Sequence, residues 1–166
     1  MSAVPLLEAV GLTLARAGRV LVRDLALTIH AGEFWAVIGE NGTGKSSLLA
    51  ALAGLPPGPS TAVHLLGRPL VSWPPRQRAR ELGLLPQDPP PPFPATVADW
   101  VQTGRFPFQG LWRREDAQDR AQVQRALEEL ELTPLAHRDV TTLSGGERRR
   151  VEAAALLAQN PRVWLL

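Results

Sequence analysis

The stretch that most constrains the fold of this chain runs from Gly39 to Ser46 and reads Gly-Glu-Asn-Gly-Thr-Gly-Lys-Ser. It fits the pattern G-x-x-x-x-G-K-[ST] at every defined position. An apolar run at 34–38 precedes it and a helix-like run at 47–53 follows it. This is the strand–loop–helix context of a phosphate-binding loop. A glycine-rich turn that happens to precede a helix is the alternative, and the agreement of pattern and context disfavours it.

Each residue type in the loop has a physical role. The glycines let successive backbone N–H groups curl toward phosphate oxygens, and the helix that follows directs its positive end at the same anion. Lys45 is the only lysine among 18 basic residues, as expected where a compact point charge is needed among phosphates. The candidate nucleotide-binding residues are Gly39, Glu40, Asn41, Gly42, Thr43, Gly44, Lys45, Ser46 and Ser47.

The composition indicates a globular protein of one domain-sized unit. The chain has 166 residues, of which 45% are hydrophobic and 20% charged. No apolar run reaches the roughly 18 residues that a membrane-spanning helix needs, and the N-terminus does not resemble a secretion signal. The chain has no cysteine, which excludes a cysteine-ligated metal site, and its net charge of +2 does not indicate nucleic-acid binding.

The first half of the chain alternates between strand-like and helix-like segments. Alternating apolar residues predict antiparallel strands at 6–15 and 19–30, joined by a turn at Ala17-Gly18. Apolar runs, prolines and glycines then predict a strand at 34–38, an irregular stop at 56–59, a strand at 61–66, a helix at 76–81, a strand at 83–86 and a stiff extended loop at 88–94.

Residues 96–160 follow a helical pattern. Thr96 and Asp99 are spaced as a helix cap, and residues 115–132 are amphipathic. Ser144 is expected to cap a helix that ends near residue 160 and a final strand to begin at 162. The side chains expected to face the core from that helix are Val151, Ala154, Ala155 and Ala158. The pattern predicts an α/β domain with an inserted helical subdomain.

A second motif, Leu143-Ser144-Gly145-Gly146-Glu147, begins the predicted helix. Ser144 and Glu147 are spaced as a capping box, and the two glycines leave the backbone bare so that an anion can approach the helix N-terminus. A capping box with no further role is the alternative, which becomes less plausible in a chain that also carries a phosphate loop.

With both motifs in order, the chain resembles the nucleotide-binding domain of ATP-binding cassette (ABC) ATPases over its whole length. Residues 39–46 match the Walker A motif of that family, 143–147 match its signature motif, and Gln87 matches its Q-loop. The resemblance implies a P-loop NTPase core with an N-terminal antiparallel β subdomain and an inserted helical subdomain. We expect a single, incomplete nucleotide-binding domain over 1–166. Its parts would be an ATP-binding core with the antiparallel β subdomain at 1–88, the helical subdomain at 89–142, and the signature helix with the start of the Walker B strand at 143–166.

The family also implies roles for individual residues. Lys45 would neutralise the triphosphate of ATP. The catalytic candidates are Lys45 and Gln87. Ser46 and Gln87 would hold Mg²⁺. Two copies of the domain would pack head to tail, and the signature residues would then contact the nucleotide of the other copy. The cross-subunit candidates are Ser144, Gly145, Gly146 and Glu147.

The chain departs from the family pattern in two places. The adenine-stacking position, usually aromatic, is occupied by Arg16, which either stacks on the base or is a solvated surface charge. The chain ends at Arg162-Val163-Trp164-Leu165-Leu166, before the acidic residues that follow a Walker B strand. We expect a fragment of a longer protein that is inactive by itself; a pseudo-enzyme is the alternative.

The segment 96–107 resembles the pattern T-V-x-x-x-V-x-x-G-R-x-P of importers for iron-siderophores, haem and cobalamin. This implies an ATP-hydrolysing subunit at the cytoplasmic face of a membrane. Its partners would be a second copy of the domain, permease subunits and, indirectly, a substrate-binding protein, and not nucleic acid. The alternatives are a soluble ABC ATPase that acts on DNA or ribosomes, and a nucleotide-binding module without turnover.

Overall fold

The computed structural model describes residues 4–56, 60–87, 94–109 and 116–166, which form two compact units. The first unit takes the chain up to Arg78, together with Leu165, and the second begins at Ala79. The predicted stop at 56–59 lies outside the described residues except for Pro56, and the predicted loop at 88–94 lies outside them except for Pro94. The finer division at residues 88 and 142 stays a prediction.

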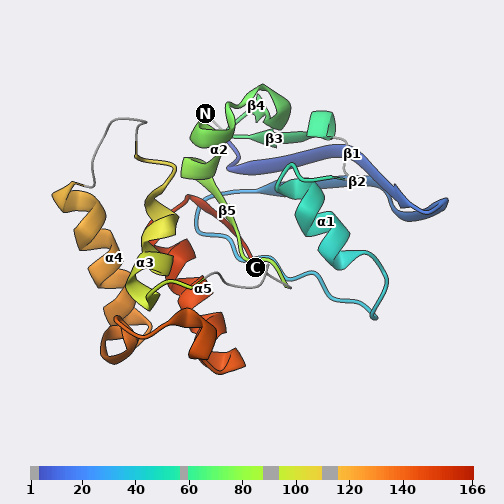
Figure 1. The fold of residues 1–166 in the computed structure, drawn as a ribbon. Helices are drawn as coiled ribbons and strands as arrows, with labels where there is room; N and C mark the ends of the chain where they lie inside the picture. Colours follow the sequence, from blue (N-terminus) through green and yellow to red (C-terminus); the bar gives the residue numbers. More distant parts are fainter. Residues whose placement is uncertain (1–3, 57–59, 88–93, 110–115) are drawn as a thin grey trace. The chain divides into compact units, whose positions relative to one another are not determined.

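The first unit is built on a four-stranded antiparallel sheet with the order β2-β1-β3-β4 (Figure 1). The predicted hairpin is confirmed, with Leu7 opposite Ile29 and Arg16 opposite Arg19. The strands are β1 (Leu7–Arg16), β2 (Arg19–Ile29), β3 (Val63–Leu65) and β4 (Arg68–Pro69).

The core of this unit comes from the alternation that the sequence shows in β1. Leu7 and Ala9 are buried two residues apart, and so are Leu12 and Leu14, as alternation along a strand predicts. A register shift between Ala9 and Leu12 accompanies the change of phase that lets both pairs be buried. Beside the sheet lies α1 (Lys45–Leu52), which buries Leu48 and Leu52 (Figure 1). The remaining short elements are η1 (Ser60–Ala62), η2 (Leu70–Ser72) and α2 (Pro75–Glu81), of which α2 reaches into the second unit.

The predicted strand at 34–38 is wrong in this structure. These residues are irregular, and Phe34 and Ile38 are 90% and 92% exposed. A strand needs a neighbour that satisfies its N–H and C=O groups. Within the part of the chain that the structure describes, no strand pairs with this run.

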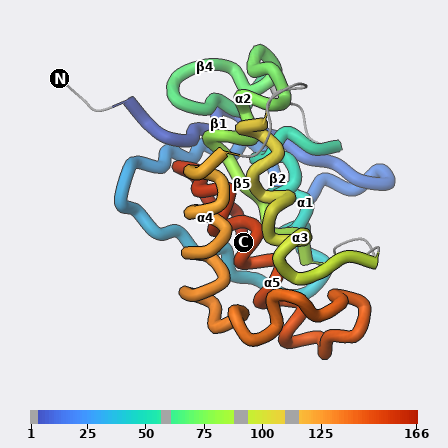
Figure 2. The backbone as a smooth tube through the Cα atoms, turned by 60° about the vertical axis from the view of Figure 1, so that its left-hand side comes forward, coloured from blue at the N-terminus to red at the C-terminus, as the bar shows by residue number. Residues whose placement is uncertain are grey.

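The second unit packs three helices around one apolar cluster, and they lie side by side in Figure 2. The helices are α3 (Val97–Gln102), α4 (Ala117–Glu129) and α5 (Gly145–Gln159). The connecting 3₁₀ turns are η3 (Thr103–Arg105), η4 (Thr133–Leu135) and η5 (Val140–Thr142). A two-stranded sheet joins β5 (Leu82–Leu84) to β6 (Val163–Leu165).

The caps of these helices follow the sequence. The capping boxes Thr96–Asp99 and Ser144–Glu147 are both formed, and Asn160 ends α5 in the left-handed conformation. One predicted core residue is wrong. Ala155 is only half-buried, and Leu156 is buried in its place, with its side chain against Gly83 of β5.

Candidate functional site

The phosphate loop lies in the first unit and begins α1 at Lys45. Its turn depends on two glycines in left-handed conformations, Gly42 with φ 80° and Gly44 with φ 103°. A Cβ at Gly44 would also lie 2.9 Å from the Cβ of Leu21 on β2. A larger residue at either position would strain the backbone, and at Gly44 it would also displace the loop from the sheet.

Lys45 folds back across the loop that precedes it. Its Nζ donates hydrogen bonds to the carbonyl oxygens of Gly39 at 2.8 Å and Glu40 at 2.7 Å. The hydroxyl of Thr43 donates to the same Glu40 carbonyl at 2.8 Å. An ammonium group has three donors, so Lys45 can hold the loop closed with two of them while it directs positive charge at the concave backbone.

The N-terminus of α1 is suited to an anion. Gly44 occupies the cap position, and among the described residues no side chain caps this helix end. The first turn contains no acidic residue that would repel a phosphate. Backbone N–H groups and the positive end of the helix dipole therefore lie next to the Lys45 ammonium, which is the chemistry of phosphate binding.

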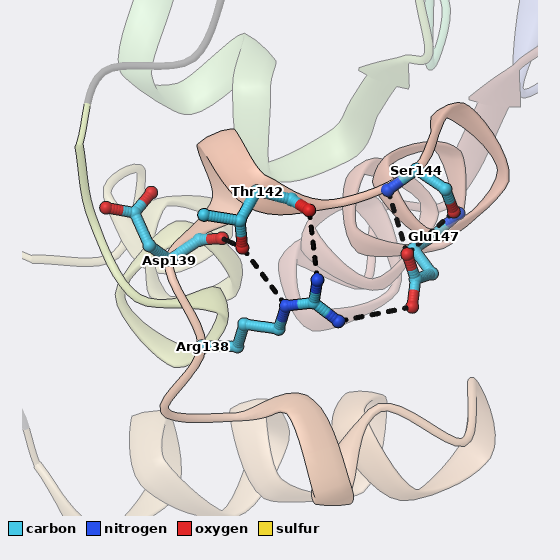
Figure 3. Close-up of polar contacts among 5 residues, drawn as sticks. All are labelled: Arg138, Asp139, Thr142, Ser144 and Glu147. Atoms are coloured by element: carbon cyan, nitrogen blue, oxygen red, sulfur yellow. Dashed lines mark hydrogen bonds and ion pairs between the residues drawn. The ribbon is translucent and has the colours of Figure 1, made fainter.

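The signature residues lie in the second unit, at the N-terminus of α5 (Figure 3). The Oε2 atom of Glu147 accepts from the Ser144 N–H at 2.8 Å and from the Ser144 hydroxyl at 2.6 Å. The hydroxyl in turn accepts from the Glu147 N–H at 3.3 Å. The Ser144 hydroxyl and N–H, together with the cations Arg138 and Arg150, hold the pKa of Glu147 below its usual range.

The two signature glycines have open space above them. Gly145 and Gly146 are exposed, and a Cβ added to either would meet no described atom within 4 Å. Packing within the described part of the chain therefore gives no reason for glycine at these positions. An anion or a second chain that approaches the helix backbone closely would give such a reason.

The turn before the signature is held by Arg138 and Asp139 (Figure 3). Arg138 donates from Nε to the Thr142 hydroxyl and from Nη2 to the Thr142 carbonyl, both at 3.0 Å. Asp139 accepts from the hydroxyl and N–H of Thr141, which lower the pKa of its carboxyl. These contacts fix the backbone that delivers Ser144 to the start of α5.

Gln87 is exposed and follows β5 in the second unit. The carbonyl of the preceding residue, Pro86, accepts a hydrogen bond from Nη1 of Arg149 at 2.6 Å. Arg149 also pairs with Glu152 at 3.2 Å. The signature helix is therefore tied directly to the segment that presents Gln87. Sequence reasoning missed this contact, because it joins residues 63 positions apart.

Arg16, the residue at the adenine-stacking position, is the last residue of β1 and is exposed beside the hairpin turn at Ala17 and Gly18. The structure thus collects the phosphate-loop candidates and Arg16 in the first unit. The signature residues and Gln87 belong to the second unit.

In the described ranges no three or more His, Asp or Glu side chains are grouped as a metal site. None of the helices described is both long and apolar enough to cross a membrane.

Comparison with known families identifies one match that covers most of the chain. The family described as "ABC transporter" matches residues 22–166. Among solved structures, an inward-facing putative metal-chelate type ABC transporter aligns over 95% of this chain and 57% of its own, with a TM-score of 0.74 and 27% identity. An ATP-binding subunit of an ABC transporter aligns over 96% and 64%, with a TM-score of 0.81. At 22% identity this second likeness concerns the fold alone.

Curated relatives share 37% to 43% of their aligned residues with this chain. A probable siderophore transport system ATP-binding protein of Bacillus subtilis is 40% identical over 93% of the chain. A hemin import ATP-binding protein of Bordetella parapertussis is 43% identical over 92%. An iron(3+)-hydroxamate import ATP-binding protein of Bacillus subtilis is 37% identical over 89%. The chain spans about half the length of these relatives, 56%, 57% and 55% respectively.

Proposed function

Because this chain belongs to the ABC transporter family, we propose that it acts in the ATP-binding subunit of a membrane importer. Such a subunit hydrolyses ATP and couples binding and hydrolysis to uptake. The observation that carries the proposal is the closed loop before α1, in which Lys45 bonds the carbonyls of Gly39 and Glu40 beside a helix end whose cap residue is Gly44. This arrangement is built to hold a triphosphate.

The donor chemistry of the loop fits magnesium as well. Ser46, in the first unit, carries a hydroxyl, and Gln87, in the second, carries an amide oxygen; both residues are exposed. Mg²⁺ prefers hard oxygen ligands and takes most of its shell from water and substrate phosphates, so a small number of neutral protein oxygens is sufficient. Bound there, Mg²⁺ would offset the charge of the β- and γ-phosphates. Lys45 would hold the γ-phosphate, and Gln87 would orient groups around it.

A second copy of the domain is the proposed partner for the signature residues. Ser144, Gly145 and Gly146 would contact the γ-phosphate that the other copy holds in its phosphate loop. The open space above Gly145 and Gly146 supports this proposal, because it admits an incoming anion without repacking. ATP would then hold the two copies together head to tail, and its hydrolysis would release them.

We place the protein at the cytoplasmic face of the cell membrane, where it would bind permease subunits. A substrate-binding protein would deliver the substrate to those permease subunits. The relatives named for siderophore, hemin and iron(3+)-hydroxamate import support an iron chelate as the transported substrate. The segment 96–107 supports the same group from the sequence side.

The proposal is tested by uptake in the source organism after deletion of the gene. Ferric hydroxamate siderophore, haemin and cobalamin are supplied separately, and accumulation of each is measured. We expect loss of uptake of an iron-siderophore or of haemin, restored by the wild-type gene and not by Lys45→Ala. Unchanged uptake of both iron compounds in the deletion strain would overturn the importer assignment for iron.

A further inference from the structure

We propose that Arg138 is a positioning residue for Ser144, which acts by offsetting the charge of Glu147 beside the signature motif. The inference rests on the proposed function, because it concerns how Ser144 reaches the phosphate of a second copy. Arg138 itself would not touch nucleotide.

The first step is the state of the Ser144 hydroxyl. It donates its proton to Oε2 of Glu147 at 2.6 Å, and the Ser144 N–H is 2.8 Å from the same oxygen. To bind a phosphate oxygen, Ser144 has to turn its proton away from Glu147. The Glu147 carboxylate opposes this in two ways, because it holds the proton and because its negative charge repels the phosphate.

The second step is the cation on the other side of Glu147. Nη1 of Arg138 lies 3.8 Å from Oε1, the carboxylate oxygen that Ser144 does not use (Figure 3). The Arg138 guanidinium thus offsets the charge of the carboxylate from the Oε1 side, without competing with Ser144 for Oε2. Arg150 is a second cation that acts on Glu147, and it ranks after Arg138 in its effect on the carboxyl.

The third step is the way in which Arg138 is held. Its Nε and Nη2 both bond Thr142, whose hydroxyl donates to the Asp139 carbonyl at 2.7 Å. An exposed ion pair usually gains little, because two long side chains lose freedom to form it. Here the guanidinium is already fixed by the turn, so its charge stays near Glu147, although 47% of the Arg138 side chain is exposed.

The experiment measures dimerisation of the protein encoded by the full gene, by light scattering with saturating Mg²⁺ and β,γ-imido ATP. Arg138→Gln removes the charge, and we expect the dimer dissociation constant to rise about threefold to fivefold, the scale of an exposed charge pair. Arg138→Lys keeps the charge but loses the two-bond contact with Thr142 that holds it near Glu147, so its dissociation constant should rise less than that of Arg138→Gln. Arg125→Gln is the matched control, because it removes an arginine from an exposed pair on α4.

The decisive comparison repeats the substitution in a Glu147→Gln background. If Arg138 acts on the charge of Glu147, Arg138→Gln should have no further effect there. An equal loss in both backgrounds, or a loss in Arg138→Lys as large as in Arg138→Gln, would show a purely structural role for the turn and overturn the inference. So would wild-type dimerisation by Arg138→Gln. Failure of the wild-type protein to dimerise would instead contradict the proposed function.

Discussion

Arg105 and Asp119 form an ion pair inside the second unit, with Arg105 Nε 2.9 Å from Asp119 Oδ1 and both side chains 5% exposed. Arg105 also donates from Nη1 to the Ala158 carbonyl at 2.7 Å, and its guanidinium lies 3.9 Å from the centre of the Phe108 ring. One arginine of η3 therefore holds α4 and the last turn of α5. Gly104 and Arg105, which belong to the segment 96–107, thus have a structural role: Gly104 lies against the Ala155 carbonyl, and Arg105 binds Asp119 and the Ala158 carbonyl.

Removal of Asp119 should destabilise this unit strongly. In Asp119→Ala the Arg105 charge stays buried without its carboxylate, which typically costs about 3–5 kcal/mol. Urea denaturation of the purified protein measures the loss. Glu129→Ala, which breaks the exposed pair of Arg125 and Glu129 on the same helix, is the control and should have a far smaller effect. Equal losses in the two variants would contradict a special role for the buried pair.

Two glycines of the second unit should differ in how much stability an alanine costs. A Cβ at Gly104 would collide with the carbonyl oxygen of Ala155, so Gly104→Ala should cost about 1–3 kcal/mol by overpacking. At Gly145 an added Cβ meets no described atom within 4 Å, so Gly145→Ala should leave the unfolding free energy nearly unchanged. Urea titration of both variants checks this, and a larger loss at Gly145 than at Gly104 would refute it.

The Ser144–Glu147 cap should make stability depend on acid pH. The Ser144 hydroxyl and N–H, with Arg138 and Arg150, lower the folded-state pKa of Glu147. Its contribution is therefore complete above the unfolded-state pKa, about 4.3, and is lost as pH falls through the folded-state pKa. The difference in unfolding free energy between wild type and Glu147→Gln should shrink over that acid range. A difference that stays constant with pH would show that the Glu147 charge contributes nothing.

A negative charge at Ser144 should separate its capping role from its proposed phosphate contact. Aspartate caps a helix as well as serine does, so Ser144→Asp should keep the bond to the Glu147 N–H. It loses the hydroxyl that donates to the Glu147 carboxylate, so it should keep only part of the roughly 1 kcal/mol that a cap provides. Its charge would meet the γ-phosphate, so dimerisation with Mg²⁺ and β,γ-imido ATP should be lost. Ser144→Arg should also prevent dimerisation and leave nucleotide binding to the phosphate loop largely intact. Normal dimerisation of Ser144→Asp, seen by light scattering, would leave Ser144 with a capping role alone.

The features that sequence predicted well depend on residues close along the chain. The Ser144–Glu147 and Thr96–Asp99 caps each join residues three apart, and the hairpin of β1 and β2 turns at Ala17 and Gly18. Both motifs of the candidate site are local in the same sense, and the fold they imply agrees with the solved ABC structures.

The features that sequence reasoning missed join distant residues. Arg149 and Pro86 are 63 positions apart, and Arg105 and Ala158 are 53 apart. Nothing in the local pattern assigns one arginine among 17 to a particular distant carbonyl. The strand predicted at 34–38 is wrong for a related reason. Apolar composition favours a strand, but a strand forms only where another segment pairs with it.

The most direct test of the central claim is the affinity of the purified protein for MgATP, measured by isothermal titration calorimetry for wild type and Lys45→Ala. Lys45 is the chain's only lysine, and it supplies the point charge beside the uncapped N-terminus of α1. Loss of a charged hydrogen-bond donor to phosphate should weaken binding at least about tenfold. Arg125→Gln, which removes a charge elsewhere, should bind MgATP as wild type does. Unchanged affinity in Lys45→Ala would contradict the assignment of residues 39–46 as the phosphate-binding loop.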